Sequence, residues 1–167
     1  EVETTDTGKV LKETRWQAKY IAEYLHFYAG AADKVSGETL PIDKPDMFVF
    51  TDREPLGVIA AIVPWNSQLF LSAVKIGPAL AAGNAIVFKP SEVTPLTALK
   101  LAEIFTEAGL PDGVFNVVNG DKEAVDAILT NKDIKAVSFV GSTPVAEAIY
   151  KKASENGKRC QALGGAK

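Results

Sequence analysis

The sequence contains a single histidine and a single cysteine among its 167 residues. One cysteine excludes an internal disulfide and a cysteine-rich zinc site. The lone histidine, His26, lies in a segment with helical spacing and has no second histidine to share a metal ion. Zinc chemistry and hydrolysis by a Ser-His-Asp triad are therefore unsupported, and we expect no bound metal.

An excess of charge of one sign and a long apolar run are also lacking. Lys plus Arg total 18 and Asp plus Glu total 21, for a net charge of −3, so there is no basic surplus to attract nucleic acid. The longest apolar stretch, Leu56 to Trp65, is too short to cross a bilayer. The acidic, polar start, Glu1 to Asp6, is unlike a signal or transit peptide. We expect a soluble, cytoplasmic protein with no membrane or nucleic-acid partner.

From Val58 onward, short apolar runs rich in β-branched residues alternate with helical patterns. The expected strands are Val58–Val63, Ala85–Lys89, Val114–Val118, Ala136–Val140 and Arg159–Leu163. The expected helices are Leu69–Ala82, Pro95–Ala108, Lys122–Leu129 and Val145–Ser154. Strands that are apolar on both faces and separated by helices predict an α/β fold, with a Rossmann-like parallel sheet and helices on both faces.

The first third of the chain has a different pattern. Residues Lys9 to Val35 lack proline and carry apolar residues at helical spacing, which predicts one long N-terminal helix. Met47 to Thr51 has β character between two turn-forming segments. We divide the chain into an N-terminal helix and β-hairpin arm over residues 1–53 and a βαβ domain over 54–167. The chain stops directly after a strand, so we expect a partial domain, truncated at its C-terminal end.

Three positions predict where helices begin or end. Thr94 and Thr143 each precede a proline, the pattern of an N-cap residue followed by proline at the first helical position. Gly109 follows a helical pattern where a left-handed terminator is expected.

In an open parallel sheet, ligands bind outside the carboxyl ends of the strands. There, Lys89-Pro90-Ser91-Glu92 offers an ammonium, a hydroxyl and a carboxylate, groups that can hydrogen-bond the hydroxyls of a ribose. The alternative is a solvated polar turn. Gly141-Ser142-Thr143 opens a helix whose free N–H groups can bind phosphate, the alternative being ordinary helix capping. The usual dinucleotide fingerprint, G-x-G-x-x-G, is missing.

Two further residues are candidates for chemistry. Asn66 follows a strand and opens a helix, where its amide can donate to a developing oxyanion, although the same position suits a helix cap. Cys160 lies in an expected strand, where a small buried hydrophobe is the more common role.

In order along the chain, these segments resemble the aldehyde dehydrogenase superfamily. The resemblance rests on motifs that cover essentially the whole chain. They are Glu54-Pro55-Leu56-Gly57-Val58, Val63-Pro64-Trp65-Asn66, the run from Pro78 to Glu92, the run from Ala108 to Val118, and Ser138 to Thr143. This resemblance implies the coenzyme-binding part of an enzyme that oxidises an aldehyde with NAD.

The resemblance also assigns roles to individual residues. Asn66 would be the oxyanion-hole amide, and Lys89 and Glu92 would hold the adenosine ribose. A glutamate there favours NAD over NADP, because a 2′-phosphate would meet its negative charge. Other residues would line the nucleotide site: Val63 and Trp65 in the channel, Ser91 in the ribose turn, Gly120 beside the adenine, and Gly141 and Ser142 beside the pyrophosphate.

The sequence departs from the family pattern at three points. The family's nucleophilic cysteine lies beyond the last strand of this chain, and Cys160 precedes the Leu163-Gly164-Gly165 segment, so we reject it as the nucleophile. The glutamate that serves the family as general base is replaced by Leu163, or by Ala162 if the alignment shifts by one. Ala146 stands where a glycine is expected in the turn that begins at Gly141.

The ends of the chain resemble different branches of the family. The ending from Gly157 to Lys167 is most like methylmalonate-semialdehyde dehydrogenase, which releases its acyl group to coenzyme A. Pro64-Trp65-Asn66 is closer to the hydrolytic enzymes. We expect a full-length homo-oligomer that converts an aldehyde to an acid or an acyl-CoA, while this chain alone is inactive. The alternative is a non-catalytic fragment that binds a nucleotide or serves in oligomer assembly.

Overall fold

The computed structural model describes residues 1–165, and its centre is a sheet of five parallel strands in the order β5-β4-β3-β6-β7. The strands are β3 (Val58–Ile62), β4 (Ala85–Lys89), β5 (Phe115–Val117), β6 (Ile134–Val140) and β7 (Arg159–Leu163). Each lies within two residues of its predicted bounds. The chain runs outward from β3 to β5 on one side, then returns to place β6 against the other edge of β3. This reversal of strand order is the switch point at which α/β sheets bind ligands.

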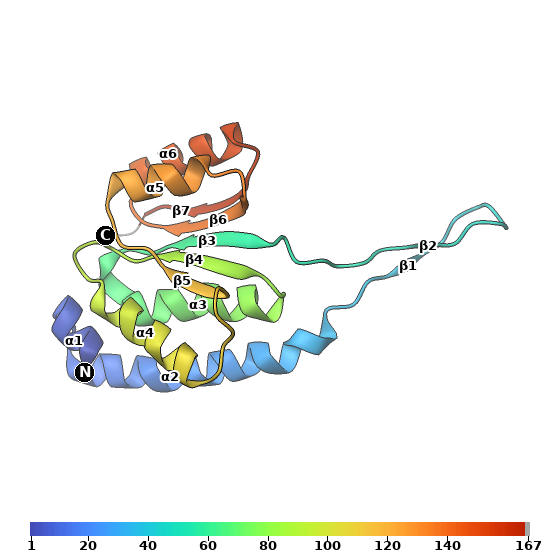
Figure 1. The fold of residues 1–167 in the computed structure, drawn as a ribbon. Helices are drawn as coiled ribbons and strands as arrows, with labels where there is room; N and C mark the ends of the chain where they lie inside the picture. The colour runs from blue at the N-terminus through green and yellow to red at the C-terminus, as the bar shows by residue number, and fades with distance from the viewer. Residues whose placement is uncertain (166–167) are drawn as a thin grey trace.

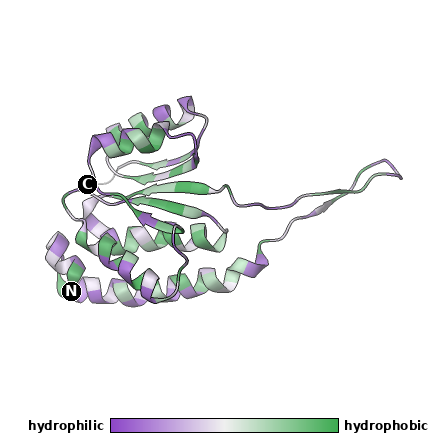
Figure 2. Ribbon diagram, viewed as in Figure 1, coloured by the Kyte–Doolittle hydropathy of each residue, from purple (hydrophilic) through white to green (hydrophobic). Residues whose placement is uncertain are grey.

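Helices cover both faces of the sheet, as predicted (Figure 1). They are α3 (Gln68–Ala81), α4 (Leu96–Glu107), α5 (Lys122–Thr130) and α6 (Thr143–Glu155). Ala60 and Ile62 of β3 pack in a buried cluster with α5 and α6, whereas Ala61 of β3 and the following Val63 pack in a second cluster with α3 and α4. Successive residues of a strand point to opposite faces, so β3 must be apolar throughout. Figure 2 shows this apolar character along the central strands.

The N-terminal segment forms two helices rather than one. The predicted helix over residues 9–35 corresponds to α2 (Leu11–Ala31) and the short 3-10 helix η1 (Ala32–Lys34), whereas α1 (Val2–Thr7) was not predicted. α2 packs along α3, with the ring centroids of Tyr20 and Phe70 5.7 Å apart. The N-terminal helix therefore adds a further layer outside α3.

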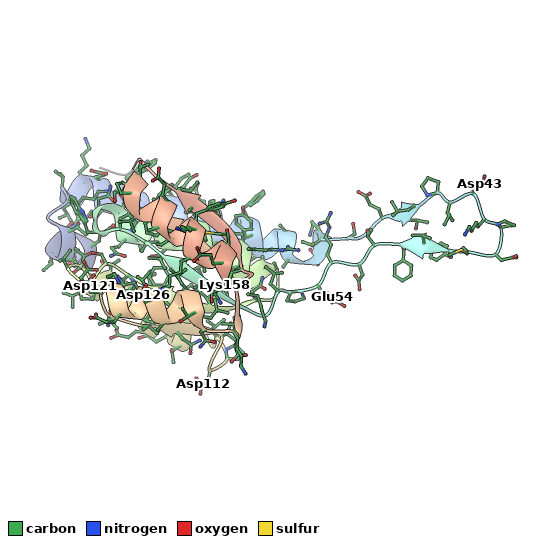
Figure 3. All side chains as sticks on the ribbon, turned by 90° about the horizontal axis from the view of Figure 1, so that it is seen from above. Asp43, Glu54, Asp112, Asp121, Asp126 and Lys158 are labelled. Carbon is green, nitrogen blue, oxygen red and sulfur yellow. The ribbon has the colours of Figure 1, made fainter. Side chains whose placement is uncertain are left out.

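A two-stranded antiparallel hairpin, β1 (Thr39–Leu40) and β2 (Val49–Phe50), projects away from the sheet. Figure 1 shows this hairpin extending from the end of the molecule opposite to the C-terminus. In Figure 3, Asp43 lies near its tip and Glu54 near its base. The predicted β character of residues 47–51 is confirmed in β2.

The predicted N-caps Thr94 and Thr143 are wrong. The N-cap of α4 is Pro95 and that of α6 is Ser142, and neither makes a side-chain capping bond. The Thr94 hydroxyl instead accepts a hydrogen bond from Gln68, and the Thr143 hydroxyl accepts one from a backbone N–H just after β7. Long-range partners have taken the place of local capping at both positions. The predicted terminator Gly109 is confirmed, because its φ of +85° follows directly after α4.

Two further observations concern membrane-spanning helices and the C-terminal residues. Within residues 1–165, no helix has both the length and the hydrophobicity needed to span a bilayer. Ala166 and Lys167, the last two residues of the motif at the C-terminal end, lie outside the described residues.

Candidate functional site

A cleft of about 700 Å³ opens at the carboxyl ends of β3, β4 and β6. Its floor is formed by the strand ends and one wall by α5 and α6. Seven of the nine residues that the sequence predicted for the site line this cleft. They are Val63, Trp65, Lys89, Ser91, Glu92, Gly141 and Ser142. The fold therefore brings together residues from loops up to 79 positions apart.

The turn after β4 presents a fixed ion pair to the cleft. Lys89 Nζ lies 3.0 Å from Glu92 Oε2, with the lysine side chain 6% exposed and the glutamate side chain 47% exposed. A hydrogen bond from its own backbone N–H and another from Lys89 lower the pKa of the Glu92 carboxyl below its usual value. Ser91 is buried in the same turn. This turn is not simply solvated, since Lys89 and Ser91 are buried in it.

The turn after β6 places the main chain of Gly141 and Ser142 at the cleft. A Cβ atom added to Gly141 would lie 2.3 Å from Cζ of Phe139, so any larger residue displaces that buried ring. Gly141 N donates to Leu163 O at 3.0 Å, which fixes the turn against β7. α6 begins two residues later, and its N-cap, Ser142, leaves the first N–H groups of the helix without a side-chain cap. Free N–H groups at a helix start suit an anionic group such as phosphate.

The wall formed by α5 and α6 is apolar within and charged at its rim. Its apolar residues are Val125, Leu129, Val145, Ala148 and Ile149. At the rim, Asp126 Oδ2 lies 2.8 Å from Lys122 Nζ, and Asp126 Oδ1 lies 2.6 Å from Lys152 Nζ. These two hydrogen bonds lower the pKa of Asp126 to about 2. Figure 3 shows Asp126 along α5, beyond Asp121 at the helix start.

Sequence reasoning missed these rim residues, although one signal was present. Lys122 and Asp126 are four residues apart in a predicted helix, a spacing that pairs opposite charges on one face. The bond between Asp126 and Lys152 joins two helices 26 residues apart, and nothing local in the sequence indicates it.

Two predicted site residues, Asn66 and Gly120, do not line the cleft. Asn66 belongs to the 3-10 helix η2 (Trp65–Ser67), beside Trp65, which does line it. Its Oδ1 atom is buried and has no hydrogen-bond partner within residues 1–165, and the N-cap of α3 is Ser67. Asn66 therefore does not cap α3. Gly120 directly precedes Asp121, which lines the cleft, and its φ of +150° lies in the region that favours glycine.

A buried lysine lies on the α3 face of the sheet. Lys75 Nζ donates to Ser138 Oγ at 2.6 Å, and Ser138 Oγ donates to Gln161 Oε1 at 2.8 Å. Burial lowers the pKa of Lys75 to about 8. The sequence shows Lys75 only as one cation within an apolar helical pattern, so its position was not predicted.

Neither Cys160 nor His26 contributes to the cleft. Cys160 packs against the core cluster beneath α5 and α6, and burial raises the pKa of its thiol. His26 is exposed on α2. Within residues 1–165, no group of three or more His, Cys, Asp or Glu side chains is arranged to hold a metal ion.

Comparison with known proteins identifies close relatives of the whole chain. The model of the family described as "Aldehyde dehydrogenase family" matches residues 1–167. A (Z)-2-((N-methylformamido)methylene)-5-hydroxybutyrolactone dehydrogenase of Acinetobacter baylyi is 51% identical over 156 residues, which are 93% of this chain and 32% of that protein. Malonate-semialdehyde dehydrogenase 1 of Shouchella clausii is 48% identical over 164 residues, which are 98% of this chain and 33% of that protein.

A solved structure of a relative has nearly the same fold. Betaine aldehyde dehydrogenase of Staphylococcus aureus, in a variant crystallised with NAD+, superposes with a TM-score of 0.93 at 38% identity, covering 98% of this chain and 33% of that chain. The predicted family is thereby confirmed. The chain spans about a third of the length of the relatives it matches.

Proposed function

The chain belongs to the aldehyde dehydrogenase family, and we propose that it forms the NAD-binding part of an enzyme that oxidises an aldehyde. The observation that carries this proposal is the cleft at the switch point between β3 and β6. There the Lys89–Glu92 pair and the start of α6 lie on the same cavity. A ribose and a phosphate are the two chemical groups that such a pair of sites suits.

The residues fit a dinucleotide in several respects. Glu92 accepts hydrogen bonds from ribose hydroxyls, and the buried Lys89 donates to them while neutralising the carboxylate. Ser91 lies in the same turn. Gly141 and Ser142 lie beside the pyrophosphate, and the uncapped N–H groups at the start of α6 donate to it, because the Gly141 N–H is already bonded to Leu163 O. NAD, when bound, accepts the hydride that an aldehyde carbon loses.

The remaining predicted residues complete this site. The apolar wall of α5 and α6 provides the adenine with a slot, with Gly120 just before it in the chain, and Val63 and Trp65 line the channel toward the nicotinamide. Asn66 supplies the oxyanion amide. Its Oδ1 atom is buried without a hydrogen-bond partner within residues 1–165.

We also propose that the nucleophile lies outside this chain. Cys160 is partly buried beneath α5 and α6, and burial raises its thiol pKa, which reduces the thiolate needed for attack. The relatives named above are about three times as long as this chain. The proposed substrate class is an aldehyde, and one relative is named malonate-semialdehyde dehydrogenase. Coenzyme A is an added co-substrate in this proposal.

The hairpin arm supports a homo-oligomer. Met47, Phe48 and Phe50 are exposed on it, and the rings of Phe48 and Phe50 are 5.7 Å apart. We propose that a second copy covers these side chains. Light scattering of the full-length protein is expected to give a smaller mass for Phe48→Ser than for the parent, and an unchanged mass would contradict this assignment.

The main experiment separates the proposal from its alternative, a non-catalytic fragment. NAD is titrated into the 167-residue chain and into the full-length protein, with Trp65 fluorescence as the signal. Binding to both, with NADH formed from aldehydes only by the full-length protein, is the expected result. Cys160→Ser is the matched control and leaves binding unchanged. Binding without any aldehyde oxidation by the full-length protein would favour the non-catalytic alternative, and steady NADH production by the 167-residue chain would reject the assignment of the nucleophile.

A further inference from the structure

A fully buried amide joins two of the loops at the cleft. Gln68, at the first position of α3, donates from Nε2 to the carbonyl oxygen of Thr94 at 3.0 Å and to the Thr94 hydroxyl at 2.7 Å. Gln68 and Thr94 are both buried. Only the Nε2 group of this amide is hydrogen-bonded, because the buried Oε1 atom has no partner within residues 1–165. Burial of a donor is costly unless it is hydrogen-bonded, so the two bonds from Nε2 favour one arrangement of the two segments.

The two ends of this bridge belong to different parts of the site. Gln68 lies two residues after Asn66, at the start of α3. Thr94 lies two residues after Glu92, in the loop that follows β4, and its N–H donates to Ser91 O at 3.2 Å. The bridge therefore links the turn that holds the Lys89–Glu92 pair to the turn that holds Asn66.

Helix α1 supplies a second link between the same segments. Glu3 Oε1 accepts from the N–H of Leu69 in the first turn of α3, at 3.2 Å. Asp6 Oδ2 accepts from the N–H and the hydroxyl of Thr97 in the first turn of α4, at 2.9 and 3.1 Å. Neither helix is capped by the side chain of its own N-cap residue. The carboxylates of one short helix thus cap both α3 and α4 and fix the N-termini of these two helices relative to each other.

We propose that Gln68 is a positioning residue, which couples occupation of the ribose turn to the placement of Asn66. This inference rests on the proposed NAD site. A nucleotide that binds Lys89 and Glu92 immobilises the turn that includes Thr94. Through the buried bridge, the same binding fixes the start of α3 and the η2 turn that carries the Asn66 amide. Binding energy from the adenosine end, far from the reacting carbon, is then used to orient an oxyanion donor.

The coupling must act in both directions, because linkage between two sites is reciprocal. A ligand that orders the Asn66 turn should tighten nucleotide binding by the same factor. Gln68 acts only through Asn66 and Thr94 and contacts no reacting group in this proposal.

The test is hydrogen–deuterium exchange of the full-length protein with adenosine 5′-monophosphate as the probe. This nucleotide fills the adenosine part of the cleft and lacks the nicotinamide half that would approach Asn66. In the parent, it is expected to slow amide exchange in residues 89–94 and also in 65–70. Gln68→Leu removes both hydrogen bonds of the bridge, and Thr94→Val removes one. In both variants, the nucleotide should still slow amide exchange in residues 89–94, but the slowing in residues 65–70 should be reduced or lost. Thr94→Ser, which keeps the hydroxyl, restores the parent pattern.

Ser72→Ala is the matched control, because the buried Ser72 hydroxyl donates within α3 to the carbonyl of Gln68 and has no bond to the β4 loop. It should behave as the parent does. If the nucleotide slows amide exchange in residues 65–70 equally in the parent and in both bridge variants, the coupling is overturned. The coupling is also overturned if exchange in residues 65–70 of the parent is not slowed. No slowing in either segment would reject the nucleotide site itself and the coupling with it.

Steady-state kinetics of the full-length enzyme give an independent readout. Because removal of an oxyanion donor typically costs 10²- to 10³-fold in kcat, misplacement of Asn66 should cost about tenfold. We expect Gln68→Leu and Thr94→Val to lower kcat in this way and to change the KM for NAD by less than about threefold. A loss confined to KM would show that the bridge only shapes the nucleotide site, and this result would also overturn the proposal. Thr94→Val keeps one of the two bonds, so the test stands even if Gln68→Leu does not fold.

Discussion

Lys89 and Glu92 form an ion pair in which the cation is buried and the anion is half-exposed, with Nζ and Oε2 3.0 Å apart. The lysine is the last residue of β4, so the central sheet fixes its backbone. The glutamate lies in the following turn and faces the cleft. The negative end of this pair is therefore the more accessible one in the cleft, while the buried positive end anchors it.

In the proposed NAD site, this arrangement predicts a preference for NAD over NADP. Glu92→Gln keeps the shape and one hydrogen-bond acceptor but removes the charge that repels a 2′-phosphate. We expect the preference for NAD to narrow by roughly 1–3 kcal/mol, measured as the ratio of the two dissociation constants.

A control for this substitution is present on α4. Lys100 and Glu103 form an exposed pair with the same three-residue spacing, 2.6 Å apart. Glu103→Gln should leave the ratio of NAD to NADP affinity unchanged. If Glu92→Gln also leaves it unchanged, the assignment of the ribose turn is wrong.

The second prediction concerns Asp126, which is paired with Lys122 on its own helix and with Lys152 on α6. Its pKa in the folded protein, about 2, is below the ordinary 3.8, so its pairs stabilise the fold above pH 4. This contribution is lost as the pH falls through 2. Asp126→Asn should lower the free energy of unfolding at pH 6, and the difference from the parent should shrink toward pH 2.

Urea denaturation at pH 6 and at pH 3 measures this difference. The effect should also weaken in 1 M salt, because both pairs are largely solvated. Asp112→Asn is the control, since Asp112 is exposed and forms no ion pair within residues 1–165. A loss of stability in Asp126→Asn that is independent of pH would point to packing rather than charge.

The third prediction concerns Lys75, whose ammonium is buried beside Ser138 and takes part in no ion pair within residues 1–165. Burial lowers its pKa from 10.5 to about 8. Between these values the unfolded chain binds the proton and the folded chain does not, so stability rises with pH over this range. The rise attributable to Lys75 is on the order of 3 kcal/mol.

Lys75→Met keeps most of the side-chain volume and should reduce the increase of the unfolding free energy with pH. The measurement is the urea unfolding free energy of the chain at pH 7.5 and at pH 10, compared between variant and parent. Lys135→Met, at an exposed lysine of β6, is the control and should keep the slope of the parent. Equal slopes in Lys75→Met and the parent would show that Lys75 keeps an ordinary pKa.

The sequence was sufficient for the sheet and for most of the cleft because both depend on local patterns. β3 and β4 are apolar on both faces, which only a covered parallel strand explains, and the polar residues that follow them necessarily gather at one edge. What could not be predicted is long-range: the Gln68–Thr94 bridge and the Asp126–Lys152 pair join residues 26 positions apart. Thr94 is an example: its position before Pro95 predicts a helix cap, but its hydroxyl accepts a hydrogen bond from the distant Gln68 instead.

The last prediction concerns release of the acyl group by the full-length enzyme. The resemblance to the family implies a general-base glutamate just before the Gly-Gly segment, where this chain has Ala162 and Leu163. Ala162 packs against the core beneath α5 and α6, and Leu163 is 48% exposed at the end of β7. Neither provides a carboxylate. A positioned base typically accelerates attack by water about 10²- to 10⁴-fold, so hydrolysis of a thioester should be slow here.

Coenzyme A depends less on such a base, because part of its thiol is already ionised near neutral pH. We therefore expect a burst of NADH equal to one per active site, followed by slow turnover that coenzyme A accelerates. The measurement is stopped-flow absorbance of the full-length enzyme with aldehyde and NAD, with and without coenzyme A. Leu163→Glu and Ala162→Glu test the missing base directly: at the correct position, the carboxylate should increase turnover in water. Rapid turnover of the parent without coenzyme A, unchanged when it is added, would place the enzyme in the hydrolytic branch that Pro64-Trp65-Asn66 resembles.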